Sequence, residues 1–308
     1  MRGLCSQSWI SVGVLSMMLV ACQLPGRSVP ERENLRAADD LALIAAELEM
    51  HLRDDTYRYG RAVGVDGRNV FASVLWRLDR LQRHRARALD RWEKVDVVIE
   101  FARARALERL RRYPEALAAY ERAAAAGTPL REVAVEASEA LGPFVLHSGQ
   151  PTRRLAVPEE ERDFLDQRIA KWRELAWEFR NTRYEGLAFE ELEAWEMLRL
   201  EWLAQNDPGP VAVAACERLI ERHHESKLYA KHLIRLGDLH AREASGEYMR
   251  YRAHRGGFDV EHYQESLDRA LSAYELARSE PRPSLVKLAK QKIDELLTAH
   301  EAVYADAP

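Results

Sequence analysis

The sequence predicts an all-α protein, an array of antiparallel helix hairpins without a β-sheet. Apolar residues recur at helical spacing from Leu35 onward, and no stretch alternates convincingly between apolar and polar residues as a strand would. Ala, Leu, Glu and Arg dominate, whereas the 308 residues include only 15 Gly and 12 Pro. The abundant side chains lose little rotamer freedom in a helix. Short turns between the periodic segments then favour antiparallel neighbours.

Each predicted helix rests on its own apolar pattern. The first stripe runs from Leu35 to Leu52 and the second from Phe71 to Leu89, with a glycine-containing loop between them. Several later helices begin close to a proline, where the missing N–H costs no hydrogen bond. The predicted helices are 35–52, 69–89, 95–112, 114–126, 129–141, 159–181, 184–205, 210–223, 227–245, 260–279 and 284–302.

The N-terminal segment predicts export. Arg2 precedes an apolar run from about Trp9 to Ala21. This run is shorter than the roughly 20 residues that a transmembrane helix needs, but it suits the apolar part of a signal peptide. The Pro/Gly/polar residues that follow predict a flexible tether. We therefore divide the chain into a signal peptide at 1–21, a tether at 22–34 and a helical domain at 35–308, in which 143–158 is a candidate internal boundary.

The residues Leu19-Val20-Ala21-Cys22 close the apolar run and resemble the lipobox of bacterial lipoproteins. The resemblance implies cleavage between Ala21 and Cys22, a diacylglycerol on the Cys22 sulfur and a further acyl chain, such as palmitate, on its amino group. Several acyl chains on one residue bind a membrane stably. The residue after Cys22 is Gln23 and not Asp, which resembles the sorting pattern for the outer membrane. In a Gram-negative cell this resemblance implies that the protein is located on the periplasmic face of the outer membrane. The alternative is an ordinary signal peptide or an uncleaved anchor with a chance cysteine.

Two segments resemble tetratricopeptide repeats. In "RYPEALAAYERAAAAGTP", Ala116, Tyr120 and Ala123 match the second helix of such a repeat. Small residues there let two helices approach, and an aromatic side chain fills the remaining gap. The resemblance implies that these three residues pack against the helix before them.

The second match has both helices of the repeat. "LIRLGDLH" places Gly237 in the first helix, and "ALSAYELARSEP" places Ala270, Tyr274 and Ala277 in the second. Together with the segment before them, these residues resemble periplasmic repeat lipoproteins of outer-membrane assembly. The spacing departs from the family, because Gly237 and Ala270 are 33 residues apart where about 12 are usual. Some 21 residues are therefore predicted to be inserted between the paired helices.

The inserted segment, Gly246 to Asp259, is the first candidate binding site. Tyr and Arg dominate interface hot spots, and loops on a rigid scaffold often bind partners. A second loop, Thr56 to Arg68, has similar composition. The alternatives are solvated loops, or a helix extension whose aromatic residues pack locally. The candidate partner-binding residues are Tyr248, Arg250, Tyr251 and Arg255 in the first segment, and Tyr57, Arg58 and Arg61 in the second.

A basic stripe lies on the predicted helix 69–89 and just beyond it. Its members are Arg77, Arg80, His84, Arg87 and Arg91. They fall on one helical face, opposite the apolar face. The stripe suits an anionic surface such as lipid headgroups or an acidic partner. The alternatives are a solvated face and an internal charge match with the acidic segment 159–201.

Composition excludes several functional classes. The formal net charge of −4 argues against nucleic-acid binding. Three cysteines without a CxxC pair predict neither a disulfide framework nor a zinc site, and Cys216 is expected to be a buried apolar residue. His224, His232 and His240 are eight residues apart and rotate away from one another on a helix. We therefore expect no metal, cofactor or catalytic residues. Trp172, Trp177, Trp195 and Trp202 are expected to pack in the core.

These observations favour a membrane-anchored envelope lipoprotein that acts as a non-catalytic scaffold or adaptor. Its partners would be other envelope proteins, bound by the helical surface or the inserted segment. The alternative is an envelope enzyme acting on peptidoglycan or a small molecule, with a site formed only in three dimensions. A third reading is an assembly lipoprotein without a discrete ligand.

Overall fold

The computed structural model describes residues 29–60, 68–89, 95–149, 158–253 and 257–306. These residues form eleven helices and no β-strand, which confirms the predicted all-α array of helix hairpins. The contacts divide the chain into two compact units, residues 1–150 and 151–308, and the division lies inside the range 143–158. Each unit is described by itself. The predicted signal peptide and the residues that resemble a lipobox, 1–22, lie outside the described residues.

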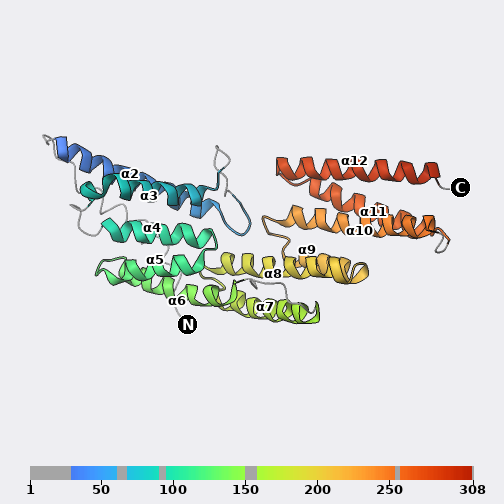
Figure 1. Ribbon diagram of the computed structural model, residues 1–308, viewed down its shortest axis with the longest axis horizontal. Coiled ribbons are helices and arrows are strands. Elements are labelled where there is room, and N and C mark those ends of the chain that lie inside the picture. The colour runs from blue at the N-terminus through green and yellow to red at the C-terminus, as the bar shows by residue number, and fades with distance from the viewer. Residues whose placement is uncertain (1–28, 61–67, 90–94, 150–157, 254–256, 307–308) are drawn as a thin grey trace. The chain divides into compact units, whose positions relative to one another are not determined.

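The first unit contains five described helices in consecutive contact. Figure 1 shows them as a chain of neighbouring hairpins, each helix beside the one before it. They are α2 (Val29–Asp54), α3 (Val70–Leu89), α4 (Val95–Arg109), α5 (Tyr113–Ala125) and α6 (Arg131–His147). Helix α2 begins inside the predicted tether 22–34, so residues 29–34 are helical where we predicted a flexible segment.

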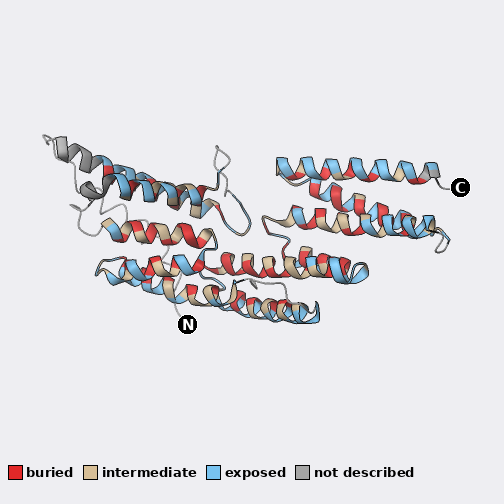
Figure 2. Ribbon diagram, in the orientation of Figure 1, coloured by how far each residue is buried: buried red, intermediate tan, exposed pale blue. Residues whose placement is uncertain are grey.

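The core of the first unit forms where these helices face each other. Leu41, Leu48, Phe71 and Leu78 are buried between α2 and α3, and Ile99 of α4 packs on the same cluster. Figure 2 shows the buried residues on the facing sides and the exposed residues on the outer sides of α2 and α3. Burial of these apolar stripes supplies the main force for helix pairing, at about 25 cal/mol per Å² of apolar surface.

The predicted repeat hairpin in this unit is formed by α4 and α5. Ala116, Tyr120 and Ala123 are fully buried on α5, as the resemblance implied. The Tyr120 ring lies edge-on to Phe101 of α4, with ring centroids 5.6 Å apart. The Tyr120 hydroxyl donates a hydrogen bond of 2.8 Å to the buried Glu108 carboxylate. The tyrosine therefore fills the gap between the helices and also supplies a donor to a carboxylate that burial has removed from water.

The second unit contains six described helices. Consecutive helices contact each other, and α10 also contacts α12. They are α7 (Pro158–Glu178), α8 (Glu185–Asn206), α9 (Pro210–Arg222), α10 (Tyr229–Arg252), α11 (Val260–Arg278) and α12 (Pro283–Asp306). The Asp259 side chain accepts a hydrogen bond of 3.0 Å from the His262 backbone N–H and so caps the start of α11.

The second repeat hairpin is formed by α10 and α11. Ala270, Tyr274 and Ala277 are buried on α11. The Tyr274 ring lies so close to Gly237 of α10 that an added Cβ there would stand 2.4 Å from Tyr274 Cε1. The Tyr274 hydroxyl donates a hydrogen bond of 2.9 Å to Asp238 Oδ1. This hairpin therefore repeats the arrangement of α4 and α5, with a tyrosine on the second helix bound to a carboxylate on the first.

Two helices extend well beyond their predicted ends. We expected ends at Leu141 and Ser245, but α6 continues through Pro143 to His147, and α10 continues through Gly246 to Arg252. Phe144 explains the first difference, because it is buried against Tyr113 with ring centroids 5.2 Å apart. That burial outweighs the hydrogen bond lost at Pro143. In the part of the chain that the structure describes, no helix is long and apolar enough to cross a membrane.

We predict that Gly237→Ala destabilises the second unit by about 1–2 kcal/mol. The added methyl group must displace the Tyr274 ring at a cost of about 1–3 kcal/mol, and the better helix propensity of Ala returns less than about 1 kcal/mol. Urea unfolding followed by circular dichroism measures the change. Gly246→Ala is the matched control on the same helix. No atom lies within 4 Å of its added Cβ, so this variant should be stabilised by up to about 1 kcal/mol. Equal shifts in both variants would contradict the packing argument.

Candidate interaction surfaces and a buried charge network

The first half of the segment 246–259 is helical and not the loop that we predicted. Residues up to Arg252 belong to α10, and Asp259 already caps α11. The extra residues between Gly237 and Ala270 therefore lengthen the two paired helices. Arg250 forms an ion pair with Glu247 on the same helix. Arg255 lies outside the described residues.

The aromatic residues of this segment pack locally. The Phe258 ring centroid lies 6.3 Å from that of Tyr248, 5.3 Å from Tyr251 and 5.3 Å from the buried Tyr263. Tyr263 in turn stacks on His300 of α12 at 5.8 Å. This arrangement is the helix-extension alternative. These aromatic residues connect α10, α11 and α12 at one end of the hydrophobic core that the three helices share. Tyr248 and Tyr251 therefore contribute to the packing of the second unit.

The second candidate segment follows α2. The Thr56 backbone N–H donates to the Tyr59 carbonyl at 2.7 Å, and the Tyr59 N–H donates to Thr56 Oγ1 at 3.1 Å, which makes a tight turn at 56–59. The preceding Asp55 is buried and accepts from Arg109 of α4 at 2.9 Å. Tyr57 and Arg58 lie in this turn, and Arg58 is exposed. Arg61 lies outside the described residues.

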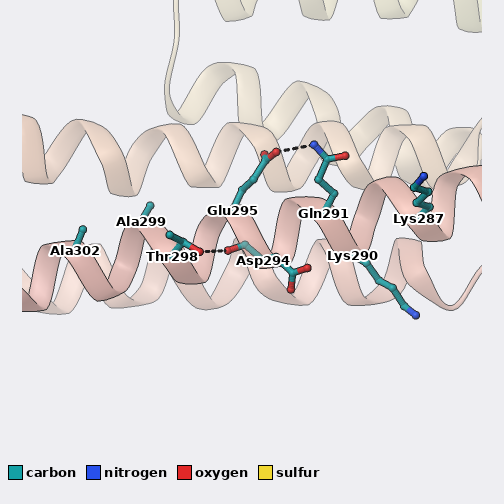
Figure 3. A pocket seen from close by; sticks show the side chains of 8 residues that line it. All are labelled: Lys287, Lys290, Gln291, Asp294, Glu295, Thr298, Ala299 and Ala302. Atoms are coloured by element: carbon teal, nitrogen blue, oxygen red, sulfur yellow. Dashed lines mark hydrogen bonds between the residues drawn. The ribbon is translucent and has the colours of Figure 1, made fainter.

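A shallow hollow of about 840 Å³ lies along the outer face of α12. Figure 3 shows its lining, which comes from this single helix. Gln291 donates to Glu295 at 2.8 Å, and the Thr298 hydroxyl donates to the Asp294 carbonyl at 2.8 Å, so these polar groups bond along their own helix. The lining residues are Lys287, Lys290, Gln291, Asp294, Glu295, Thr298, Ala299 and Ala302. A hollow without a second wall cannot hold a small molecule on several sides.

A cluster of ionisable side chains lies in the second unit, around the buried Glu196 of α8. His223 Nε2 lies 3.0 Å from Glu196 Oε2. Arg173 of α7 donates to Glu196 Oε1 at 2.9 Å, and Arg222 also pairs with that oxygen. Burial acts to raise the pKa of Glu196, but the hydrogen bonds from His223 and Arg173 and the charge of Arg222 outweigh it, so the pKa lies below its usual value.

A second buried pair lies beside the first. His232 Nε2 of α10 is 2.6 Å from Glu193 Oε1 of α8, and both side chains are almost fully buried. The His223 and His232 rings are 6.5 Å apart. Helices α7 to α10 therefore meet through the Arg173 guanidinium of α7, two carboxylates of α8 and two imidazoles, one at the end of α9 and one on α10. Such a network specifies which helix faces which, because a shifted pairing would leave charges buried without partners.

Sequence reasoning missed this network. We rejected convergence of His224, His232 and His240 and did not foresee that the partner of His232 is a glutamate 39 residues earlier in the chain. The available signal was the placement of Glu193 and Glu196 among the apolar residues of α8, where both carboxylates are buried. Which residues face these carboxylates depends on the packing of α8 against α9 and α10.

Other predicted core positions are settled by burial. Trp172 and Trp195 are fully buried as expected, and Trp202 is partly buried. Trp177 is 71% exposed, so its assignment to the core is wrong. Its ring instead lies 5.1 Å from the Arg180 guanidinium. Cys216 is buried as predicted, and burial raises the pKa of its thiol to about 12, so its reactive thiolate is scarce at neutral pH.

Among the described residues, no group of three or more His, Cys, Asp or Glu side chains is placed to hold a metal ion. No protein-family model matches this chain, and a search of curated proteins finds no significant match.

We predict that the Glu196 network makes the free energy of unfolding depend on pH in the acid range. Because the pKa of folded Glu196 is lowered, its contribution is complete above the usual carboxyl pKa of about 4.5. That contribution is lost as the pH falls through the lower folded value. At pH 7, Glu196→Gln should lower the free energy of unfolding by about 2–3 kcal/mol. This loss is smaller than that expected on breaking a fully buried pair, because Arg173 and Arg222 are partly exposed.

Urea titrations at pH 7, 5 and 3.5 measure this difference. The difference in the free energy of unfolding between wild type and Glu196→Gln should become smaller toward pH 3.5. Glu201→Gln is the matched control, because Glu201 is an exposed residue of the same helix. The free energy of unfolding of Glu201→Gln should equal that of wild type at every pH. A gap that stays constant with pH would contradict the assignment of the charge to Glu196.

Proposed function

We propose that this protein is a membrane-anchored envelope lipoprotein whose helical body acts as a non-catalytic scaffold or adaptor for other envelope proteins. The anchor is the acylated Cys22, and the protein is located on the periplasmic face of the outer membrane in a Gram-negative cell. The body is the helix array that begins at Val29.

The observation that carries the proposal is the repeated hairpin. The pairs α4–α5 and α10–α11 each bury a tyrosine whose hydroxyl bonds to a carboxylate of the first helix. Tetratricopeptide-like hairpins of this kind are interaction modules that present rigid helix surfaces. The buried ionisable groups of α7 to α10 are bound to one another, which supports a structural role for them.

Exposed apolar side chains supply candidate contact points on this scaffold. Met249 and Leu276 are 61% and 56% exposed on α10 and α11, and Trp177 is exposed on α7. Isolated exposed apolar residues are common on any protein. These three nevertheless stand on the helices that form the second unit, and they are the positions from which partner contact is most directly tested.

The anchor is tested by Cys22→Ala. Because this substitution removes the sulfur that carries the lipid, we expect the protein to leave the membrane fraction and to lose incorporation of labelled palmitate. Cys5→Ala is the matched control, since Cys5 precedes the predicted cleavage site and its loss should leave both properties unchanged. If the Cys22→Ala protein stays in the membrane fraction like wild type, the anchor assignment is wrong.

The scaffold role is tested by photo-crosslinking in intact cells. A photoreactive residue at Met249, Leu276 or Trp177 should give discrete adducts with envelope proteins at one or more of these positions. Lys290, which is exposed on the outer face of α12, is the comparison position. Absence of any adduct at all three apolar positions, with normal protein levels, would count against a scaffold that uses this part of the surface.

A further inference from the structure

Helix α3 carries an exposed face whose charge differs from that of its neighbours. The helix contains five arginines and one acidic residue, Asp79. Trp76 is 52% exposed, and the Arg80 guanidinium lies 5.4 Å from its ring centroid. Arg83 and His84 are exposed on the same side. We call Trp76, Arg80, Arg83 and His84 the basic face of α3. Arg91 and the side chain of Arg87, which the sequence placed on this stripe, lie outside the described residues.

Two acidic groups close to this face, Glu47 and Asp79, are already bound. Glu47 of α2 pairs with Arg77, at the edge of the α2–α3 contact. The Asp79 carboxylate accepts from Arg103 of α4 at 2.8 Å. In the described residues, no carboxylate pairs with Arg80 or Arg83. An ion pair inside the first unit, with Glu47 and not with the acidic segment 159–201 that we considered, therefore accounts for Arg77 but not for the basic face.

The basic face lies close to the point where the chain enters the folded body. Two contacts fix the register of the hairpin: Glu47 with Arg77, and the His51 ring 6.4 Å from the Phe71 ring. Residue numbers rise along α2 where they fall along α3, so Arg80 to His84 lie beside the middle of α2. Figure 1 shows the two helices side by side. At 1.5 Å per residue, the basic face is within roughly 25 Å of Val29 along the helix.

The chain between the proposed lipid and α2 is short. Residues 23–28 separate Cys22 from Val29, and six residues span at most about 20 Å. If Cys22 is acylated, α2 and α3 are therefore held within a few nanometres of the headgroups. Arginine attracts anionic lipids close to a membrane surface, and tryptophan favours the membrane–water interface. The basic face combines both.

We propose that the basic face of α3 docks on anionic lipid headgroups of the membrane that carries the anchor. The inference rests on the proposed lipoprotein function for its geometry. Asp39 and Asp40 are exposed on the neighbouring part of α2 and reduce the attraction. The docking is therefore weak and sensitive to salt, and it acts once the anchor has raised the local concentration of the membrane. Its effect is to fix the orientation of the first unit at the membrane surface.

The test uses a form that carries no lipid, residues 22–308 with Cys22→Ala. Every helix that the structure describes lies within 29–306, so this form retains all the contacts described above. Its binding is measured by flotation with vesicles of phosphatidylcholine alone and of phosphatidylcholine with one-third phosphatidylglycerol. We expect binding only to the anionic vesicles, at 50 mM salt, with a loss of most of it at 300 mM salt.

Substitutions locate the binding. Arg80→Gln/Arg83→Gln should lower the partition coefficient about 25-fold, at about fivefold per arginine. Arg218→Gln/Arg242→Gln is the matched control, because both arginines are exposed in the second unit and their loss changes the net charge equally. This control should bind like the parent. The fluorescence emission should shift to the blue on binding, and the shift should disappear in Trp76→Phe.

Three results would overturn the proposal. They are equal binding to neutral and anionic vesicles, equal loss in the two double variants, and an unchanged blue shift in Trp76→Phe. Binding to polyglutamate that depends on Arg80 and Arg83, without binding to anionic vesicles, would assign this face to an acidic protein partner instead. Because the test protein has no lipid, its outcome is independent of the Cys22→Ala fractionation. A failed anchor and a failed basic face are thus told apart.

Discussion

The close approach of paired helices around a tyrosine is the constraint on which both repeat-like hairpins depend. On α10 the position facing the ring must be glycine, since a Cβ there would stand 2.4 Å from Tyr274. The approach brings the Tyr274 hydroxyl to Asp238, whose carboxylate also binds Lys292 of α12 at 3.0 Å. Burial and the neighbouring carboxylate both raise the pKa of Tyr274, so the phenol stays protonated and remains a donor. One small residue thus allows three helices to be joined.

The two units solve the same packing problem with different side chains. In the first unit, Ala104 is fully buried where the second unit has Gly237, and Glu108 receives the Tyr120 hydroxyl where the second unit has Asp238. Helices α7 to α10 are instead joined by buried His–Glu pairs. Buried polar pairs of this kind add specificity more than stability, because their attraction is offset by the cost of desolvation. They hold the four helices in one arrangement.

Several features of the fold followed directly from the sequence. The helical period and the scarcity of glycine predicted an all-α array, and the Ala/Tyr spacing predicted which faces of α5 and α11 are buried. Helix ends were less predictable. Gly142-Pro143 and Gly246 disfavour helix locally, yet they lie inside α6 and α10. Burial of Phe144 outweighs this preference in α6, and packing of aromatic side chains around Phe258 outweighs it in α10. Local propensity amounts to about 1 kcal/mol per glycine, whereas burial of an aromatic side chain contributes more.

The sequence by itself determined the helical class and the paired small and aromatic residues, since each is a pattern of neighbours along the chain. Only the tertiary structure decided that Glu193 and Glu196 meet two histidines, and that Trp177 faces solvent while Trp172 does not. It also decided that Arg77 is bound to α2 while Arg80 and Arg83 remain on an open face. These distinctions depend on which side of each helix its neighbours cover. Periodicity defines the sides of a helix, and packing decides what each side meets.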